Sequence, residues 1–165
     1  MSADKQNKVK IMHRNTHENN TYLFLNSLAS ILVSGEDTNG EFCVIHTFSK
    51  KSDGPPLHVH EKEDETFFVL EGEITFFVGD EIISAKTGDY VFAPRGIPHT
   101  LKVSSDTAKC LVTAYPSGFD SFIKDLGVPY QDGMKIPEGP PPLEVLQKLI
   151  KTSEKYNISY PNLTL

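Results

Sequence analysis

The residues of this chain whose types and spacing favour chemistry are three histidines and a glutamate. His58 and His60 are two positions apart, so on a β-strand their side chains point to the same face. After a short charged turn, a second predicted strand carries Glu65, and His99 begins a third strand thirty-four residues later. Neutral imidazole and carboxylate together suit divalent Fe, Mn, Ni, Cu or Zn. The sequence therefore predicts one transition metal bound by His58, His60, Glu65 and His99.

The identity of the acidic ligand is the open point of this prediction. Glu61, Glu63 and Asp64 lie close to Glu65 in the sequence. Glu61 falls in the predicted turn, and Asp64 points to the opposite strand face from Glu65. Glu63 shares the parity of Glu65 and remains a rival. The alternative for the whole set is that the histidines lie on polar surface turns and bind no metal.

These residues belong to two sequence blocks that resemble the two motifs of the cupin superfamily. The first block contains Gly54, His58, His60, Glu65 and Gly72. The second contains Gly88, Pro94, Gly96 and His99, and fifteen residues separate the two blocks. The surrounding residues resemble the small single-domain cupins similar to quercetin 2,3-dioxygenase, roughly over residues 20–125.

Two positions depart from the family pattern. The first motif usually has five residues between its opening glycine and first histidine, whereas Gly54 leaves three before His58. The second motif often ends in asparagine, and Val103 stands at that position. Neither departure removes a metal ligand, but both leave the subfamily open.

The resemblance implies a metal-dependent dioxygenase, an oxidoreductase that uses O2 to open a flavonol or another small enol-bearing molecule. In that reaction Glu65 would be the catalytic residue, alternating between metal ligand and general base. Two alternatives stay open: a non-catalytic metal-containing cupin that binds or senses a small ligand, and a metal-dependent cupin isomerase. Oxygen uptake would separate the first interpretation from the other two.

The elements that must position these residues are short strands with turn signals every eight to twelve residues, which favours a sandwich or barrel. The expected fold is all-β, a double-stranded β-helix (cupin) barrel with a C-terminal helical extension. Residues 1–20 are expected to be a flexible N-terminal arm or exchanged strand, residues 21–116 the barrel, and residues 117–165 helices packed on it.

The extension is expected to contain two helices. Ser117 and Asp120 resemble the N-cap and third residue of a capping box at the first helix. A second helix is predicted over residues 143–156, with one apolar side formed by Leu143, Leu146, Leu149 and Ile150.

The pocket beside the metal is harder to predict, because both faces of the strand over residues 41–48 are largely apolar. His46 either lines the pocket or is a buried histidine bonded to a backbone carbonyl. Aromatic residues could wall a flat substrate or simply form core. The pocket candidates are Phe42, Val44, His46, Phe67, Phe92 and Tyr115.

The composition limits the classes of partner that the chain is expected to bind. The 165 residues include 16 Lys and Arg against 22 Asp and Glu, a net charge of −6, which argues against nucleic acid or an anionic membrane as partner. No apolar run reaches the roughly 20 residues of a membrane span. The polar N-terminus and two isolated cysteines favour a cytoplasmic, reduced protein. The cupin resemblance implies a small-molecule substrate as its partner. The polar arm before residue 21 could exchange strands in a homodimer.

Overall fold

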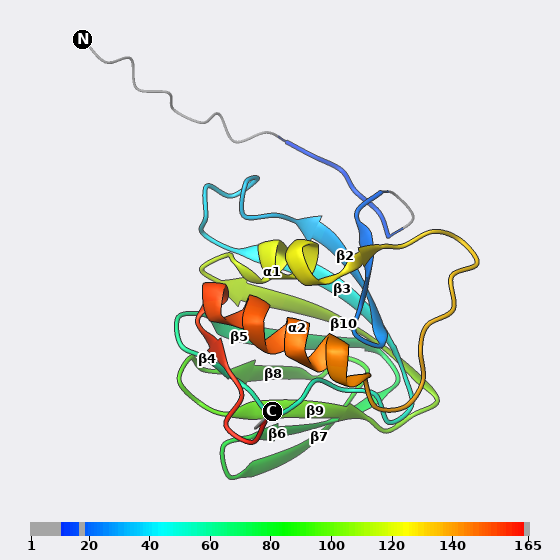
Figure 1. Cartoon of the computed structure of the whole chain (residues 1–165), viewed down its shortest axis with the longest axis vertical. Coiled ribbons are helices and arrows are strands. Elements are labelled where there is room, and N and C mark those ends of the chain that lie inside the picture. Colours follow the sequence, from blue (N-terminus) through cyan, green and yellow to red (C-terminus); the bar gives the residue numbers. More distant parts are fainter. Residues whose placement is uncertain (1–10, 17–18, 164–165) are drawn as a thin grey trace.

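The structure, a computed structural model, describes residues 11–16 and 19–163. Its largest feature is an antiparallel sheet in the order β11-β1-β2-β3-β10-β5-β8 (Figure 1). These strands are β1 Thr21–Phe24, β2 Ser27–Val33, β3 Cys43–Lys50, β5 Asp64–Glu71, β8 Tyr90–Ala93, β10 Thr107–Tyr115 and β11 Val128–Pro129.

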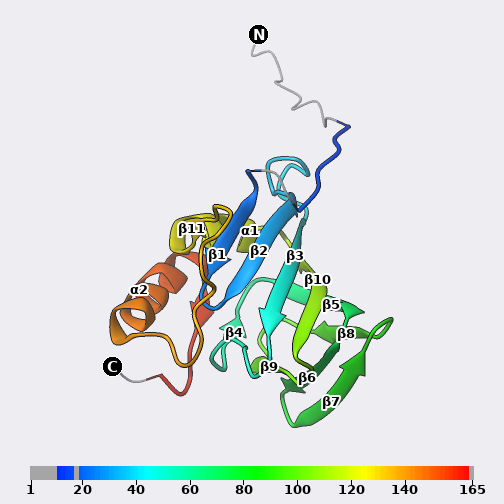
Figure 2. The same ribbon diagram turned by 90° about the vertical axis from the view of Figure 1, so that its right-hand side faces the viewer.

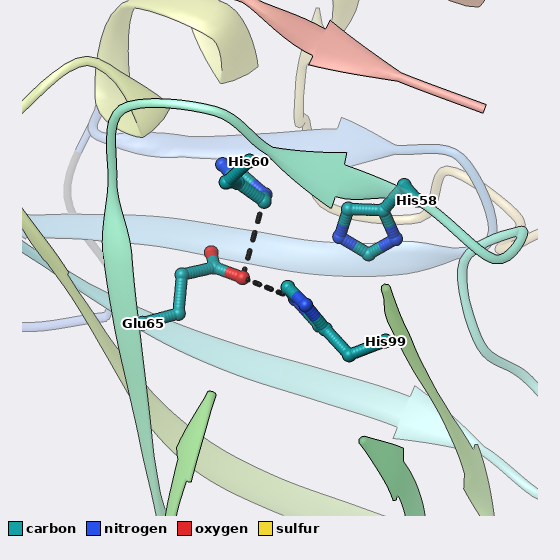
Figure 3. A group of neighbouring side chains, drawn as sticks. All are labelled: His58, His60, Glu65 and His99. Carbon is teal, nitrogen blue, oxygen red and sulfur yellow. Dashed lines mark hydrogen bonds and ion pairs between the residues drawn. The ribbon is translucent and has the colours of Figure 1, made fainter. Parts of the chain in front are cut away.

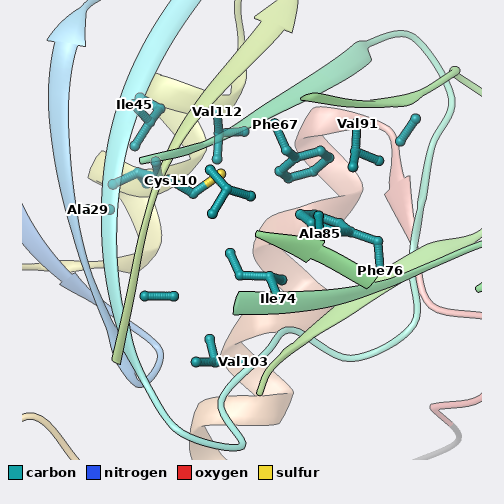
Figure 4. Close-up of a cluster of buried hydrophobic side chains, with 14 of the residues drawn as sticks. Ala29, Ile45, Phe67, Ile74, Phe76, Ala85, Val91, Val103, Cys110 and Val112 are labelled. Atoms are coloured by element: carbon teal, nitrogen blue, oxygen red, sulfur yellow. The ribbon is translucent and has the colours of Figure 1, made fainter. Parts of the chain in front are cut away.

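A second sheet has the order β7-β6-β9, and a two-stranded ribbon pairs β4 with β12. The strands concerned are β4 Val59–His60, β6 Glu73–Val78, β7 Glu81–Lys86, β9 His99–Val103 and β12 Ile158–Ser159. Alternate residues of both sheets point into one shared apolar core (Figure 4). Examples are Ile45 and Phe67 from the larger sheet and Phe76 from the smaller, each at most 5% exposed. The predicted double-stranded β-helix with C-terminal helices is confirmed.

The chain crosses from the larger sheet to the smaller at Gly72, between β5 and β6. Its φ of +83° lies in the left-handed region that favours glycine. A Cβ atom there would lie 2.3 Å from the carbonyl oxygen of Thr107, so this crossing requires a glycine on two counts.

The helices lie on one side of the molecule, beside β1 and β4 and away from β7 (Figure 2). They are α1 Phe119–Leu126 and α2 Leu143–Ser153, followed by the 3₁₀ turn η1 Glu154–Tyr156. Their apolar faces meet in a second cluster built on Phe122, Leu126, Leu149 and Ile158. Helical stability here comes mainly from this packing, because helices of this length are marginal alone.

Two details of the helices differ from the sequence prediction. The capping box is wrong: α1 begins one residue later, after Gly118, and has no side-chain cap. Asp120, displaced by that shift, instead accepts a hydrogen bond from the Gly35 amide at 3.0 Å. Leu143 is 61% exposed, because the buried stripe of α2 runs toward its C-terminal end through Leu149 and Ser153.

The expected N-terminal arm falls largely on residues 1–10, 17 and 18, which lie outside the described residues, so it stays a prediction. Where the arm is described, Arg14 pairs with Asp37 in the turn after β2. Within the described part of the chain, no helix has the length and apolar character needed to span a membrane.

Candidate metal centre

Three strands bring the four predicted ligands together (Figure 3). His58 immediately precedes β4 and His60 ends it, while Glu65 is the second residue of β5 and His99 the first of β9. The backbones of His58 and His99 are joined by reciprocal hydrogen bonds of 3.1 and 2.9 Å. The four side chains are buried, and one donor atom from each lies within 4.8 Å of all the others.

The distances within the group suit a bound cation. Glu65 Oε2 lies 2.9 Å from His99 Nε2 and 3.4 Å from His60 Nε2. Two donors bound about 2.1 Å from one metal lie about 3.0–3.5 Å apart when they are adjacent in octahedral or tetrahedral geometry. The residues present therefore fit a divalent transition metal.

Each imidazole is oriented through its other nitrogen. His58 Nδ1 lies 2.8 Å from the carbonyl oxygen of Pro56, and His99 Nδ1 lies 3.1 Å from that of Ile97. A carbonyl can only accept, so both rings carry a proton on Nδ1, and Nε2 is the nitrogen left to bind a metal. This arrangement is typical of metal-binding histidines.

Glu63 orients the His60 ring in the same way, through a hydrogen bond to Nδ1. Its Oε2 lies 2.7 Å from His60 Nδ1, on the side of the ring away from Glu65, and both side chains are almost fully buried. The structure thus places Glu65 in the ligand group and the rival Glu63 behind one of the ligands. The two glutamates share a parity but not a position, because Glu63 lies just before β5 begins and contacts the far side of the His60 ring.

The electrostatics of the group favour a cation. Burial, together with His99 and His60, lowers the pKa of His58 to about 3, so its ring is neutral. Burial alone would raise the pKa of Glu65, but the three histidines lower it to about 2 and keep the carboxylate ionised. Burial also opposes protonation of His60, yet Glu65 and Glu63 raise its pKa overall. Two buried carboxylates thus face the rings, and a metal would supply the missing positive charge.

A cavity of about 110 Å³ adjoins the four ligands. Its walls are mainly apolar and come from both sheets and from the C-terminal extension. Phe67 and Phe76 line it from the barrel, and Phe119 of α1 stacks edge-on to His60 at 6.1 Å between ring centroids.

Of the six pocket candidates, the structure places only Phe67 on the cavity wall. On β3 the inward residues are Cys43 and Ile45, so Val44 and His46 lie on the outer face, half-buried. Three aromatic candidates also lie outside the cavity: Phe92 is 53% exposed, and Tyr115, 42% exposed, contacts the ring of Phe42.

Sequence reasoning missed the cavity residues supplied by the extension. These are Phe119, Phe122, Leu149, Ile158 and Tyr160. The apolar stripes of the two helices indicated that these helices pack against the barrel. They did not show that the part of the barrel they cover holds the candidate metal ligands.

Comparisons with known proteins agree with this arrangement. The Cupin domain family matches residues 44–115, which include all four candidate ligands. Quercetin 2,3-dioxygenase of Bacillus subtilis is 31% identical over 104 residues, covering 63% of this chain and 31% of that protein. An uncharacterized protein of Aquifex aeolicus is 34% identical over 70 residues, 42% of this chain and 56% of that one. The chain thus spans less than two thirds of the length of either curated relative.

Solved structures share the fold. A predicted oxalate decarboxylase from Thermotoga maritima superposes with a TM-score of 0.59 at 20% identity, covering 64% of this chain and 99% of that one. An RmlC-like cupin from Shewanella frigidimarina gives 0.57 at 19% identity, covering 68% and 98%. Both motif blocks, the double-stranded β-helix and the matched family lead to one conclusion: residues 44–115 of this chain form a Cupin domain.

Proposed function

We propose that this cupin is a metal-dependent dioxygenase that acts on a small enol-bearing molecule. The observation that carries the proposal is the ionised Glu65, buried among three imidazoles at the wall of an apolar cavity. The similarity to quercetin 2,3-dioxygenase supports the reaction class, although the chain spans only 31% of that protein.

In the proposed reaction, the residues around the cavity bind the metal, accept a proton and exclude water. His58, His60, His99 and Glu65 would hold the metal, which as a Lewis acid lowers the pKa of a substrate hydroxyl beside a carbonyl. Glu65 is ionised and lines the cavity, so it would take that proton as general base. The aromatic walls, among them Phe67 and Phe119, exclude water and leave room for an apolar substrate body.

The volume of the cavity limits the size of the substrate. Pockets for drug-sized ligands usually measure about 300–1,000 Å³, whereas this cavity measures about 110 Å³. A flavonol would need the walls to part, but a compact enol or 1,3-diketone fits the available space. We therefore favour a substrate smaller than quercetin.

The test is oxygen uptake by protein purified without added metal or chelator. Elemental analysis first gives the metal and its stoichiometry. An oxygen electrode then compares pentane-2,4-dione, a small enolisable diketone, with quercetin, and substrate loss is quantified in parallel. The proposal predicts uptake with the smaller compound and none with Glu65→Gln protein that retains metal. Substrate conversion or binding without oxygen consumption would instead identify an isomerase or a ligand-binding cupin.

A further inference from the structure

The C-terminal strand β12 pairs with the strand that carries two of the candidate ligands. In this antiparallel pair, Ile158 lies opposite His60 and Ser159 opposite Val59. The Glu61 amide extends the pairing through a hydrogen bond of 3.0 Å to the carbonyl oxygen of Asn157. A segment about one hundred residues away in the sequence is thus attached to the edge of the metal centre.

This pairing decides which side chains of the segment face the metal. Residues directly opposite in an antiparallel pair point to the same face. Ile158 therefore shares the face of His60, and Tyr160, two residues further, shares it too. Both line the cavity, and the Tyr160 ring lies 6.1 Å from that of His58.

The hydroxyl of Tyr160 is only weakly engaged by the protein. Its hydrogen-bond partner among the described residues is Ser153 Oγ at 3.2 Å, longer than the usual 2.5–3.0 Å between hydroxyl oxygens. The Ser153 hydroxyl already donates its single proton to the Leu149 carbonyl at 2.6 Å, because a carbonyl can only accept. Tyr160 thus keeps its own proton available for a stronger acceptor.

Other hydroxyls on the cavity wall already have an acceptor oxygen within the protein. Thr47 donates to the Cys110 carbonyl at 3.3 Å, and Thr100 donates to the Pro55 carbonyl at 2.6 Å. Ser27 bonds to Ser49 Oγ at 2.7 Å and also to a carboxylate oxygen of Asp53. Tyr160 is therefore the lining hydroxyl best placed, beside a candidate ligand, to serve a bound molecule.

We propose that Tyr160 is a substrate-binding residue of this centre, whose hydroxyl donates a hydrogen bond to an anionic oxygen of the enol-bearing substrate. The inference rests on the proposed function and extends it: the site includes a donor from the C-terminal extension, outside both cupin motifs. Burial raises the pKa of Tyr160 to about 12, so the phenol remains protonated at neutral pH and able to donate.

The decisive comparison is Tyr160→Phe against Tyr156→Phe. Both substitutions remove one phenolic hydroxyl from the extension and keep the ring. The Tyr156 hydroxyl donates to Asp125 at 2.8 Å, outside the cavity, so its loss reports any general weakening of the extension. Each protein is loaded with zinc, which is redox-inert, and its binding of pentane-2,4-dione is measured by calorimetry. Zinc content and thermal unfolding are recorded alongside.

We expect Tyr160→Phe to weaken binding of the diketone about 3- to 10-fold, the effect of one net hydrogen bond. Zinc content should stay unchanged, and Tyr156→Phe should bind like the wild type. Equal affinity of Tyr160→Phe and wild type would overturn this inference and leave the proposed function intact. Equal weakening by both variants would also overturn it, because packing would then be the cause. A wild-type protein that binds neither zinc nor the diketone would overturn the proposed function and this inference together.

Discussion

At the scale of single residues, the centre depends on groups that bind no metal themselves. The Pro56 and Ile97 carbonyls and the Glu63 carboxylate each fix one imidazole, and none of them belongs to the ligand group. Among the three, only Glu63 is a side chain, so only it can be altered by substitution without changing the backbone.

Glu63→Gln should weaken metal binding about 10- to 100-fold, the range measured when such outer hydrogen bonds are removed. An amide oxygen is a weaker acceptor than a carboxylate for the His60 Nδ1 proton, and the ring loses basicity. Competition with a chelator measures the affinity, and Glu61→Gln, on the exposed turn, is the control. If Glu63→Gln and Glu61→Gln hold metal equally well, Glu63 does not orient His60.

The metal-free protein should lose stability as the pH falls from about 6.5. The pKa of His58 is about 3 in the fold against 6.5 as its ordinary value, so the unfolded chain takes up the proton first. This group alone reduces the free energy of unfolding by about 1.4 kcal/mol per pH unit. Glu65, with a pKa of about 2 against 4.5, adds a loss of the same sign below pH 4.5.

The protonation of His60 affects stability in a different pH range. Its pKa is raised, so its stabilising contribution is complete below pH 6.5 and is lost as the pH rises above that value. Urea unfolding with chelator present should therefore show a flatter slope between pH 6.5 and 4.5 in His58→Gln. The exposed His13→Gln serves as control, and an unchanged slope in His58→Gln would contradict the assigned pKa.

At the scale of elements, the C-terminal extension forms part of the metal cavity. Phe122, Leu149 and Ile158 connect it to the barrel through one apolar cluster, and β12 holds the edge of β4. We propose the boundary between barrel and extension at residues 116 and 117, as the sequence suggested, but expect the two parts to unfold together.

Deleting residues 157–165 should accelerate metal release and lower the melting temperature. The deletion removes the partner strand of β4 and uncovers His58 and His60, so water and chelators gain access. Deletion of residues 161–165 alone keeps β12 and Tyr160 and serves as control. Release rates are measured by mixing the metal-loaded proteins with excess chelator. Identical rates for the two deletions would show that β12 does not protect the centre.

The sequence predicted those features that a local residue pattern determines, and it did not predict those that depend on tertiary packing. The spacing of His58, His60 and Glu65 predicted their convergence, because strand parity is a local property. On β3, by contrast, both faces are apolar, and only pairing with β2 and β10 determines that Ile45 points inward rather than His46. Tyr160 could not have been found, since its position depends on β12 reaching a strand remote in sequence.

At the scale of the whole molecule, aromatic side chains gather on the outer face of the larger sheet. Phe68 and Tyr90 lie opposite each other on β5 and β8, and Phe92 follows on β8, with exposures of 37%, 61% and 53%. Strand β8 also forms one end of this sheet, so its outer edge has no neighbour among the described strands. Both features favour association of copies.

We therefore expect a homodimer, as the sequence suggested, with this aromatic face contributing to it. Light scattering at micromolar concentration should give twice the chain mass of 18.4 kDa. Phe92→Asp should shift the protein to monomer, because a charge would be buried without a partner. Ile82→Asp, at a position that is 70% exposed but lies on β7 of the other sheet, should remain dimeric. A wild-type monomer would end the idea.

The pairing of β12 with β4 also bears on the order of events during synthesis. All four candidate ligands precede residue 100, whereas the strand that covers their edge lies near residue 158. Because synthesis proceeds from the N-terminus, all four donors leave the ribosome before β12 does, and an ion can meet them while that edge is still open. An ion captured at that stage becomes enclosed once β12 joins. The metal found in the finished protein would then reflect which ion was abundant around the nascent chain as well as which ion the donor set prefers.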